Sequence, residues 1–374
     1  MMRAATLLAI ALLTSPASCY LLGPRSVTRQ QQRHANSSHH ELHPIDAAQC
    51  AHRTGGRVRL ASCLASAEDR PELDSSASGA GAMALSQLIR YPIKSARAER
   101  LDTARLTPEG VAGDRRFLVA NTMTNTALTQ RDVPRISTLE ARVEGDTLSL
   151  RAGPRHTNVT IQRAGMATRT TLFGESIPLL DQGRDVGQWL AKALDASGGG
   201  TEDGDGPLGA ALSALSGALR PRYRLLRAID DEPTGSLRRG AGLSDLAPLL
   251  LICEESLALL NSRRAGAGLP PVPMDRFRPN LVVSGCPRPH VEDSWRHVRI
   301  GATTLKVSGP CPRCTVPDVA QHSGERDSAA MGPMRGLREY RTRAGVGVAF
   351  GIYLSPTEPG ATIRVGDAVE AVSP

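Results

Sequence analysis

The chain has 374 residues and a formal charge of +8, from 45 Lys+Arg against 37 Asp+Glu. This length allows two domains of ordinary size, and a hydrophobic content of 40% excludes a wholly disordered chain. No apolar run reaches the roughly 18–20 residues that a membrane-spanning helix needs. Seven cysteines are too few for a disulfide scaffold.

The positive charge does not indicate nucleic-acid binding. Only Lys94, Lys192 and Lys306 are lysines, and the remaining basic residues are arginines scattered along the chain. A nucleic-acid surface needs clustered basic residues with aromatic side chains between them, and this chain has only 4 Phe, 2 Trp and 5 Tyr. We therefore expect no nucleic-acid partner.

The first 82 residues are typical of a targeting leader. Residues 1–19 combine Arg3, a short apolar stretch at 4–13 and small residues at 17–19, which predicts a secretory signal peptide. Residues 20–40 contain arginine, serine and glutamine but no acidic residue, as transit peptides do. The polar stretch to residue 82 is expected to be disordered. A bipartite plastid leader fits this order, with plain secretion and mitochondrial import as alternatives.

The rest of the chain is predicted to be mainly β with some α. Strands are expected at 85–93, 224–228, 249–252 and 281–284, and hairpins at 116–130, 139–150, 298–307 and 362–372. Helices are expected near 186–194 and 255–264 from apolar spacing. Residues 197–207 (SGGGTEDGDGP) indicate a flexible insertion, and 208–219 a short low-complexity helix. Many short strands with few helices favour two small β-barrel or sandwich-like units.

The sharpest local motif is Cys311-Pro312-Arg313-Cys314. A structural zinc site needs four ligands, and no second CxxC is present to supply them. A thioredoxin-like dithiol begins a helix, which Pro317 disfavours without excluding it. A third reading is a single thiolate that ligates a soft metal beside Arg313. Two further thiols, Cys253 and Cys286, are expected to be ordinary.

Arginines near strand edges give a second clue. The segments 113–117 (GDRRF) and 277–280 (FRPN) each place Arg beside polar groups, and Arg binds phosphate or carboxylate through two hydrogen bonds. Lys94-Ser95 adds a cation and a hydroxyl. Together these segments favour an anionic ligand.

Several motifs in order resemble the MOSC-domain family. YPIKS (91–95), LTPEGVAGDRRF (106–117) and TQR (129–131) resemble its N-terminal β-barrel domain. RFRPNLVVSG (276–285), EDSW (292–295), CPRC (311–314) and AFGIY (349–353) resemble the MOSC domain, and GATIRVGDAV (360–369) its last hairpin. The match covers about residues 84–373 and is similar to the mitochondrial amidoxime-reducing component and its relatives.

The resemblance implies an α+β fold in which an N-terminal β-barrel domain packs on a MOSC β-barrel domain. The implied boundaries are 83–182 for the first domain, 183–219 for a helix and insertion, and 220–373 for the MOSC domain. It also implies a molybdenum cofactor (Mo-molybdopterin), with Cys314 as the catalytic thiolate ligand to molybdenum. The implied cofactor-binding residues are Lys94, Ser95, Arg115, Ser244, Asp245, Arg278, Asn280, Arg313 and Tyr353. At positions 246 and 247 this chain has Leu246 and Ala247, where the animal members of the resembled family have hydroxylated residues.

The implied activity is reduction of an N-oxygenated substrate such as an amidoxime, hydroxylamine or N-oxide. No ferredoxin-like Cys-x4-Cys-x2-Cys run is present, so a separate donor is implied, either cytochrome b5 with its reductase or a ferredoxin. One alternative is a carrier of the cofactor or of sulfur, since MOSC domains also occur in molybdenum cofactor sulfurases, whose upstream domain uses pyridoxal phosphate. The other is a thiol redox protein that uses Cys311 and Cys314.

Overall fold

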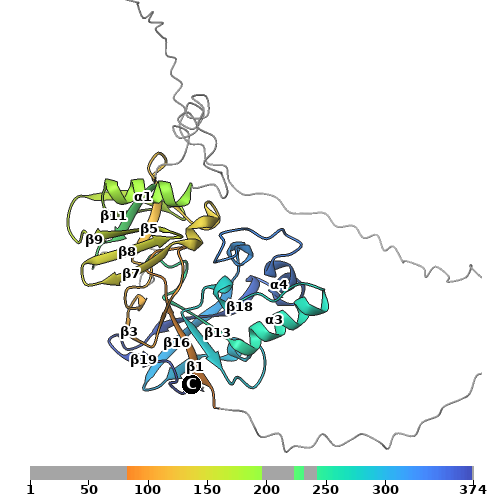
Figure 1. Cartoon of the computed structure of the whole chain (residues 1–374). Helices are drawn as coiled ribbons and strands as arrows, with labels where there is room; N and C mark the ends of the chain where they lie inside the picture. Colours follow the sequence, from red (N-terminus) through yellow and green to blue (C-terminus); the bar gives the residue numbers. More distant parts are fainter. Residues whose placement is uncertain (1–81, 196–222, 231–241, 373–374) are drawn as a thin grey trace, which may run out of the picture. The chain divides into compact units, whose positions relative to one another are not determined.

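The computed structural model describes residues 82–195, 223–230 and 242–372 (Figure 1). The expected signal peptide, the transit-like leader up to residue 81, the insertion at 197–207 and the helix at 208–219 lie outside the described residues. The described part is mostly strands with three α-helices, which confirms the prediction of a mainly β fold. These helices are α1 (Arg184–Leu194), α3 (Glu254–Gly266) and α4 (Pro333–Arg341). None of them is long and apolar enough to cross a membrane.

Five strands form a closed barrel in the N-terminal region, as expected. Its order is β10-β11-β12-β5-β6, and a parallel contact between Thr171 and Thr126 closes it. The strands are β5 (Phe117–Asn121), β6 (Thr126–Leu128), β10 (Ala167–Leu172), β11 (Glu175–Asp181) and β12 (Tyr223–Ala228). Strand β12 comes from the segment expected in the C-terminal domain, yet it pairs with β5 and β11.

The N-terminal region also contains a three-stranded antiparallel meander that is separate from the barrel. It consists of β7 (Glu140–Glu144), β8 (Thr147–Ala152) and β9 (Arg155–Thr160), with the first two forming the expected hairpin. The apolar face of α1 packs there, because Val186, Leu190 and Leu194 share one buried cluster with Leu148 of β8 and Leu225 of β12. Alternating buried and exposed residues in β8 are the pattern of a sheet with one covered face.

The larger sheet has the order β2-β1-β14-β13-β18-β16-β15-β20, with β17 paired to β18. Strand β1, the first strand of the described residues, lies in this sheet beside β14. The Ser86 hydroxyl of β1 donates a hydrogen bond to the carbonyl oxygen of Val282, 196 residues away. The strands are β1 (Ala84–Arg90), β2 (Glu99–Leu101), β13 (Leu249–Cys253), β14 (Leu281–Ser284), β15 (His297–Ile300), β16 (Thr303–Pro312), β17 (Thr342–Arg343), β18 (Gly347–Pro356) and β20 (Val369–Val372). The larger sheet therefore contains β1 from the N-terminal end of the described chain, and the barrel contains β12, which follows α1 in the described chain.

The prediction of a hairpin at 362–372 is wrong, because its two strands do not pair with each other. Both strands exist, but β19 (Thr362–Arg364) pairs with β3 (Thr103–Thr107), which in turn pairs with β4 (Gly110–Val111), whereas β20 pairs with β15. The segment that connects β19 to β20 explains why these two strands do not pair. Gly366 donates its backbone N–H to the carbonyl of Leu85, and Leu85 donates to the carbonyl of Asp367. Strand β1 therefore holds the turn, and the two flanking strands diverge to different partners.

Gly351 in the middle of β18 is required by a close approach of two strands. Its φ of +77° lies in the left-handed region, and a Cβ there would lie 2.6 Å from the carbonyl oxygen of Leu251 and 2.6 Å from Cγ1 of Ile252. Both atoms belong to β13, which is fixed inside the sheet. A side chain at this position would push β18 away from β13.

We expect Gly351→Ala to lower the free energy of unfolding by about 2–4 kcal/mol, because both backbone strain and a clash are introduced. Gly347→Ala is the matched control, since Gly347 has a φ of +82° in the same strand but nothing within 4 Å of its Cβ position. Strain alone should cost about 1 kcal/mol there. Equal losses in urea unfolding would show that the close approach is unimportant.

Candidate functional site

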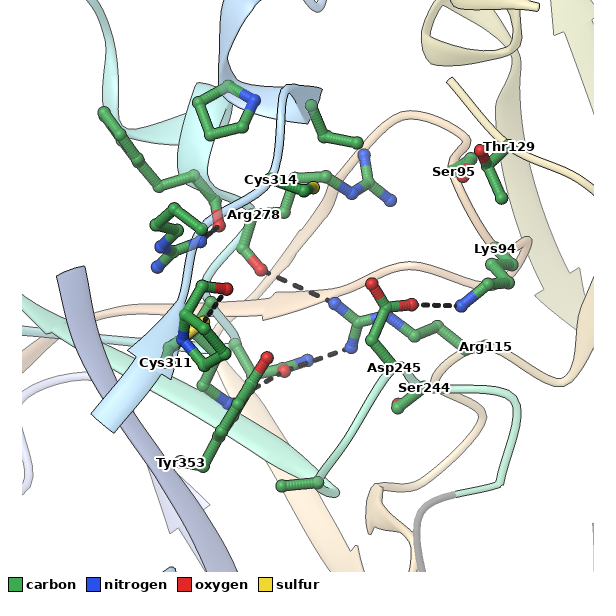
Figure 2. Close-up of a pocket in the computed structure, with 18 of the residues that line it drawn as sticks. Lys94, Ser95, Arg115, Thr129, Ser244, Asp245, Arg278, Cys311, Cys314 and Tyr353 are labelled. Atoms are coloured by element: carbon green, nitrogen blue, oxygen red, sulfur yellow. Dashed lines mark hydrogen bonds and ion pairs between the residues drawn. The ribbon is translucent and has the colours of Figure 1, made fainter. Parts of the chain in front are cut away.

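One cavity collects every site residue that the resemblance implied (Figure 2). Its lining comes from the segment after β1, the loop between β4 and β5, the loop before β13, the segment between η3 (Met274–Phe277) and β14, the end of β16, and β18. The expected residues that line it are Lys94, Ser95, Arg115, Ser244, Asp245, Arg278, Asn280, Arg313, Cys314 and Tyr353. The fold thus brings together motifs that lie up to 259 positions apart in the chain.

The backbone is strained where three of these residues lie. Ser95, Arg115 and Arg278 have φ angles of +67°, +46° and +57°, a region that residues with a Cβ rarely adopt. Such conformations persist only where the surroundings hold them, and they concentrate at functional sites. Ser95 lies in the segment after β1, Arg115 lies two residues before β5, and Arg278 directly follows η3.

Two buried guanidinium groups lie against one tyrosine ring. The centres of Arg115 and Arg278 are 4.8 and 4.2 Å from the centroid of Tyr91, which is fully buried. Asp114 forms an ion pair with Arg115, and its other oxygen accepts the backbone N–H of Tyr91 at 2.7 Å. Arg115 also donates to Oδ1 of Asn280 at 3.1 Å. Asp114 is thus the carboxylate that directly neutralises Arg115.

Arg278 is the least satisfied cation in the cavity. Its Nη1 donates to the carbonyl of Ala96 at 2.7 Å and to Oε1 of Gln321 at 3.1 Å. Its buried Nη2 has no hydrogen-bond partner among the described residues. Burial, followed by the charge of Arg115, lowers its pKa to about 10 despite the opposing effects of nearby anionic groups. An anion beside Nη2 would reverse that penalty.

A second charged group lies across the cavity. Lys94 donates to the carbonyl of Leu243 at 2.8 Å and forms an ion pair with Asp245, which also lies 3.5 Å from Nη2 of Arg131. Burial alone would raise the pKa of Asp245, but the charges of Lys94, Arg131 and Arg115 outweigh it and hold the pKa well below its usual value. Asp245 therefore stays ionised and fixes Lys94 at the cavity wall.

The two cysteines of the CPRC motif lie in different surroundings. Strand β16 continues to Pro312, beyond the end of the hairpin expected at 298–307, with register shifts at 307/309 and 310/312. Cys311 is therefore a buried strand residue, and burial raises the pKa of its thiol. Cys314 follows the strand and is half-buried in the cavity. Cys311 also borders the cavity but is only 3% exposed, so Cys314 is the sulfur more accessible to a ligand there.

Arg313 lies between these cysteines and holds the loop in place. It donates to the carbonyl of Phe350 at 2.8 Å through Nε and to the carbonyl of Phe277 at 2.8 Å through Nη1. Its guanidinium thus joins β18 to η3 through backbone oxygens. We infer that Arg313 sets the position of Cys314 as well as bordering the cavity.

Arg131 is one of the cavity residues that were not predicted from the sequence. Its Nη2 lies 3.1 Å from Sγ of Cys314, within hydrogen-bonding distance. The signal was present, because Arg131 ends the TQR stretch that carries part of the resemblance. Phe173, at the tip between β10 and β11, lies below both cations, with its centroid 4.9 Å from Lys94 Nζ and 5.6 Å from Arg131 Cζ.

The charge balance of the cavity favours an anionic ligand. Six of its lining residues are basic and one is acidic: Lys94, Arg115, Arg131, Arg276, Arg278 and Arg313 against Asp245. Arginine clusters that are desolvated in this way suit phosphate, and a half-buried thiol beside them suits a soft metal. The arrangement can therefore hold a phosphate-bearing group that also carries a metal.

We expect inorganic phosphate to raise the melting temperature of the cofactor-free chain, because a ligand that binds only the folded state stabilises it. Arg278→Gln should remove most of that rise. Arg335→Gln is the control, since Arg335 is exposed on α4 and lies outside the cavity. Equal phosphate shifts in the three proteins would contradict an anion site at Arg278.

Comparison with known proteins agrees with the resemblance seen in the motifs. Residues 82–197 match the model of the MOSC N-terminal beta barrel domain, and residues 239–370 match that of the MOSC domain. The chain is 31% identical to mitochondrial amidoxime-reducing component 1 of Mus musculus over 76% of this chain and 81% of that protein. It is 30% identical to molybdenum cofactor sulfurase of Anopheles gambiae over 72% of this chain but only 34% of that protein.

Among solved structures, the YUAD protein of Bacillus subtilis aligns with 77% of this chain and 94% of its own chain. The sequence identity is 10% and the TM-score is 0.31, a likeness too weak to add to the fold described above.

Proposed function

The chain belongs to the MOSC-domain family that includes the mitochondrial amidoxime-reducing components, and we propose that it is a molybdenum-cofactor-dependent oxidoreductase acting on N-oxygenated compounds. One observation carries the proposal. A half-buried thiol, Cys314, shares a cavity with the buried cation Arg278, whose Nη2 lacks a partner. A phosphate-bearing group with a soft metal would satisfy both.

The donor set fits that cofactor. Arg278, Arg115 and Lys94 would hold its terminal phosphate and pterin through charge-assisted hydrogen bonds, with Ser95 as a hydroxyl donor. Cys314 would supply the thiolate ligand, a soft donor suited to molybdenum. When bound, the cofactor supplies the two-electron oxygen-transfer chemistry that no side chain of this cavity could perform.

The chain's own residues would bind the cofactor, orient the thiolate and shield the substrate from water. Asp245 fixes Lys94 and approaches Arg131, and Arg131 contacts the sulfur of Cys314, so these side chains would orient the thiolate. Apolar residues also line the cavity, among them Ala247, Leu250, Val316 and Pro317. They would contact the carbon skeleton of an amidoxime or hydroxylamine substrate and exclude water from it.

A separate protein would deliver the electrons. By analogy with the family, the donor would be cytochrome b5 with its reductase, or a ferredoxin if the protein works in a plastid. The compartment stays a prediction from the leader, because residues 1–81 lie outside the described part of the chain.

The first test is metal analysis of the full chain purified from a host that makes molybdenum cofactor. We expect near-stoichiometric molybdenum and pterin in the wild type and at least a tenfold loss of molybdenum in Cys314→Ala, which removes the proposed ligand. Cys311→Ser is the matched control, since Cys311 is buried in β16 and should leave the metal in place. A folded wild-type protein without molybdenum would overturn the proposed function.

The second test separates the oxidoreductase from a cofactor carrier, a candidate favoured by the sulfurase likeness. With benzamidoxime and a chemical reductant, the loaded protein should form many equivalents of amidine, and Cys314→Ser should form almost none. A carrier would form no amidine and would release cofactor to an acceptor protein. A thiol redox protein would lose activity equally in Cys311→Ser and Cys314→Ser.

A further inference from the structure

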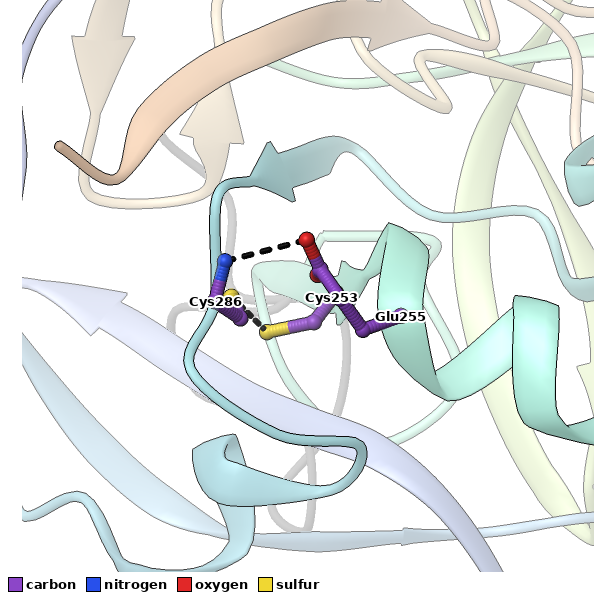
Figure 3. A group of neighbouring side chains, drawn as sticks. All are labelled: Cys253, Glu255 and Cys286. Carbon is purple, nitrogen blue, oxygen red and sulfur yellow. Dashed lines mark hydrogen bonds between the residues drawn. The ribbon is translucent and has the colours of Figure 1, made fainter. Parts of the chain in front are cut away.

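A second pair of cysteines lies outside the cavity, at the other ends of two of its strands (Figure 3). Cys253 is the last residue of β13, and Cys286 follows β14 by two positions. These strands are parallel neighbours, so their carboxyl ends meet. Both side chains are buried, with exposures of 0% for Cys253 and 7% for Cys286. Their sulfur atoms lie 2.9 Å apart.

The loop after β14 is held in place by the first turn of α3. Glu255 accepts the backbone N–H of Gly285 at 2.9 Å and of Cys286 at 3.0 Å through the same oxygen. Further along the loop, Ser256 accepts the N–H of His290 at 2.8 Å and donates to Glu292 at 2.7 Å. Cys253 is the residue immediately before this helix. The short distance between the sulfurs is therefore a result of several fixed contacts.

A metal ion would fit this group less well than a bond between the sulfurs. Cys253, Glu255 and Cys286 offer three ligand atoms within 4.8 Å of one another. Zinc–sulfur distances of about 2.3 Å in a tetrahedral site separate two thiolates by about 3.8 Å, well beyond the 2.9 Å observed. A disulfide needs about 2.05 Å, so the observed sulfur separation lies below that of a zinc dithiolate and toward that of a bond. Oε1 of Glu255 is occupied by two N–H groups of the loop, whereas its Oε2 has no hydrogen-bond partner among the described residues.

We propose that Cys253 and Cys286 form a reversible disulfide that joins β13 to the loop after β14. The oxidant is a low-molecular-weight disulfide such as oxidised glutathione. The Cys286 thiolate attacks it and releases one thiol, and the Cys253 thiolate then displaces the second thiol from the mixed disulfide. Two cysteine thiols are oxidised, one disulfide is reduced to two thiols, and their two protons pass to the two leaving thiolates.

The site favours a bond that is formed slowly and kept once formed. The hydrogen bond with Cys286, burial and the nearby Glu292 all raise the pKa of Cys253, so little of it is a thiolate at neutral pH. Oxidation should therefore speed up as the pH rises. The bond would close a loop of more than thirty residues and would join β13 and β14 at the ends away from Asn280 and Leu250, which border the cavity.

The test incubates the purified full chain with oxidised glutathione at pH 7 and pH 9, followed by alkylation of free thiols and tryptic peptide mapping. Cleavage after Arg263 and Arg276 separates Cys253 from Cys286, and cleavage after Arg296 and Arg313 separates both from Cys311 and Cys314. We expect a linked peptide pair that contains Cys253 and Cys286, formed several-fold faster at pH 9. The melting temperature should rise by about 5 °C or more and return on reduction.

Cys253→Ser and Cys286→Ser are the matched variants, and each should lose both the linked peptide and the rise in melting temperature. Cys311→Ser should keep both. The proposal is overturned if the wild type yields no such peptide, or if Cys253→Ser shows the same thermal shift. It is also overturned if the untreated protein carries stoichiometric zinc that either serine variant loses. The proposal does not depend on molybdenum, so its outcome is separate from that of the proposed function.

Discussion

The burial of two arginine side chains beside Tyr91 is the constraint on which the site depends. Removing a guanidinium from water is costly unless its hydrogen bonds and charge are met. Asp114 forms an ion pair with Arg115, whereas burial lowers the pKa of Arg278. Hydrogen bonds of Asp114 and Asn280 and of backbone oxygens connect the end of β1, the loop before β5 and the start of β14. The groups that form hydrogen bonds with these cations therefore line the cavity. Nη2 of Arg278 is left without a hydrogen-bond partner among the described residues, and a bound anion would accept a hydrogen bond from it.

The CPRC motif shows how one short stretch can divide its roles. Cys311 is a strand residue in the core at the border of the cavity, and Arg313 binds backbone oxygens of β18 and η3. Cys314 is the more exposed sulfur and lies beside Arg131. In a dithiol redox site both sulfurs would need a common reaction partner. The unequal burial of these two thiols therefore favours a single functional sulfur, in agreement with the likeness to the amidoxime-reducing components.

Local features were predictable from the sequence, and distant pairings were not. The hairpin of β7 and β8 and the helix α1 follow from turn residues and apolar spacing over a few positions. Strands β9 and β10 were missed because polar residues predominate in them and few apolar residues alternate with these, which resembles a polar loop. The pairing of β12 with β5 and of β19 with β3 joins segments about 100 and 260 positions apart, and no local pattern encodes such a partner. Cavity residues were found through motifs, whereas Arg131 lacked a spacing that linked it to Cys314, 183 positions away.

The exchange of strands between the two regions has a consequence for how the chain is made. During translation β1 leaves the ribosome early, but its partner β14 follows only after almost two hundred further residues. The barrel likewise cannot close until β12 has emerged. An apolar strand with free backbone groups would wait throughout this interval and could pair with other chains. Productive folding therefore has to follow synthesis of most of the polypeptide, and a nascent chain of this protein should need chaperone protection until β14 is available.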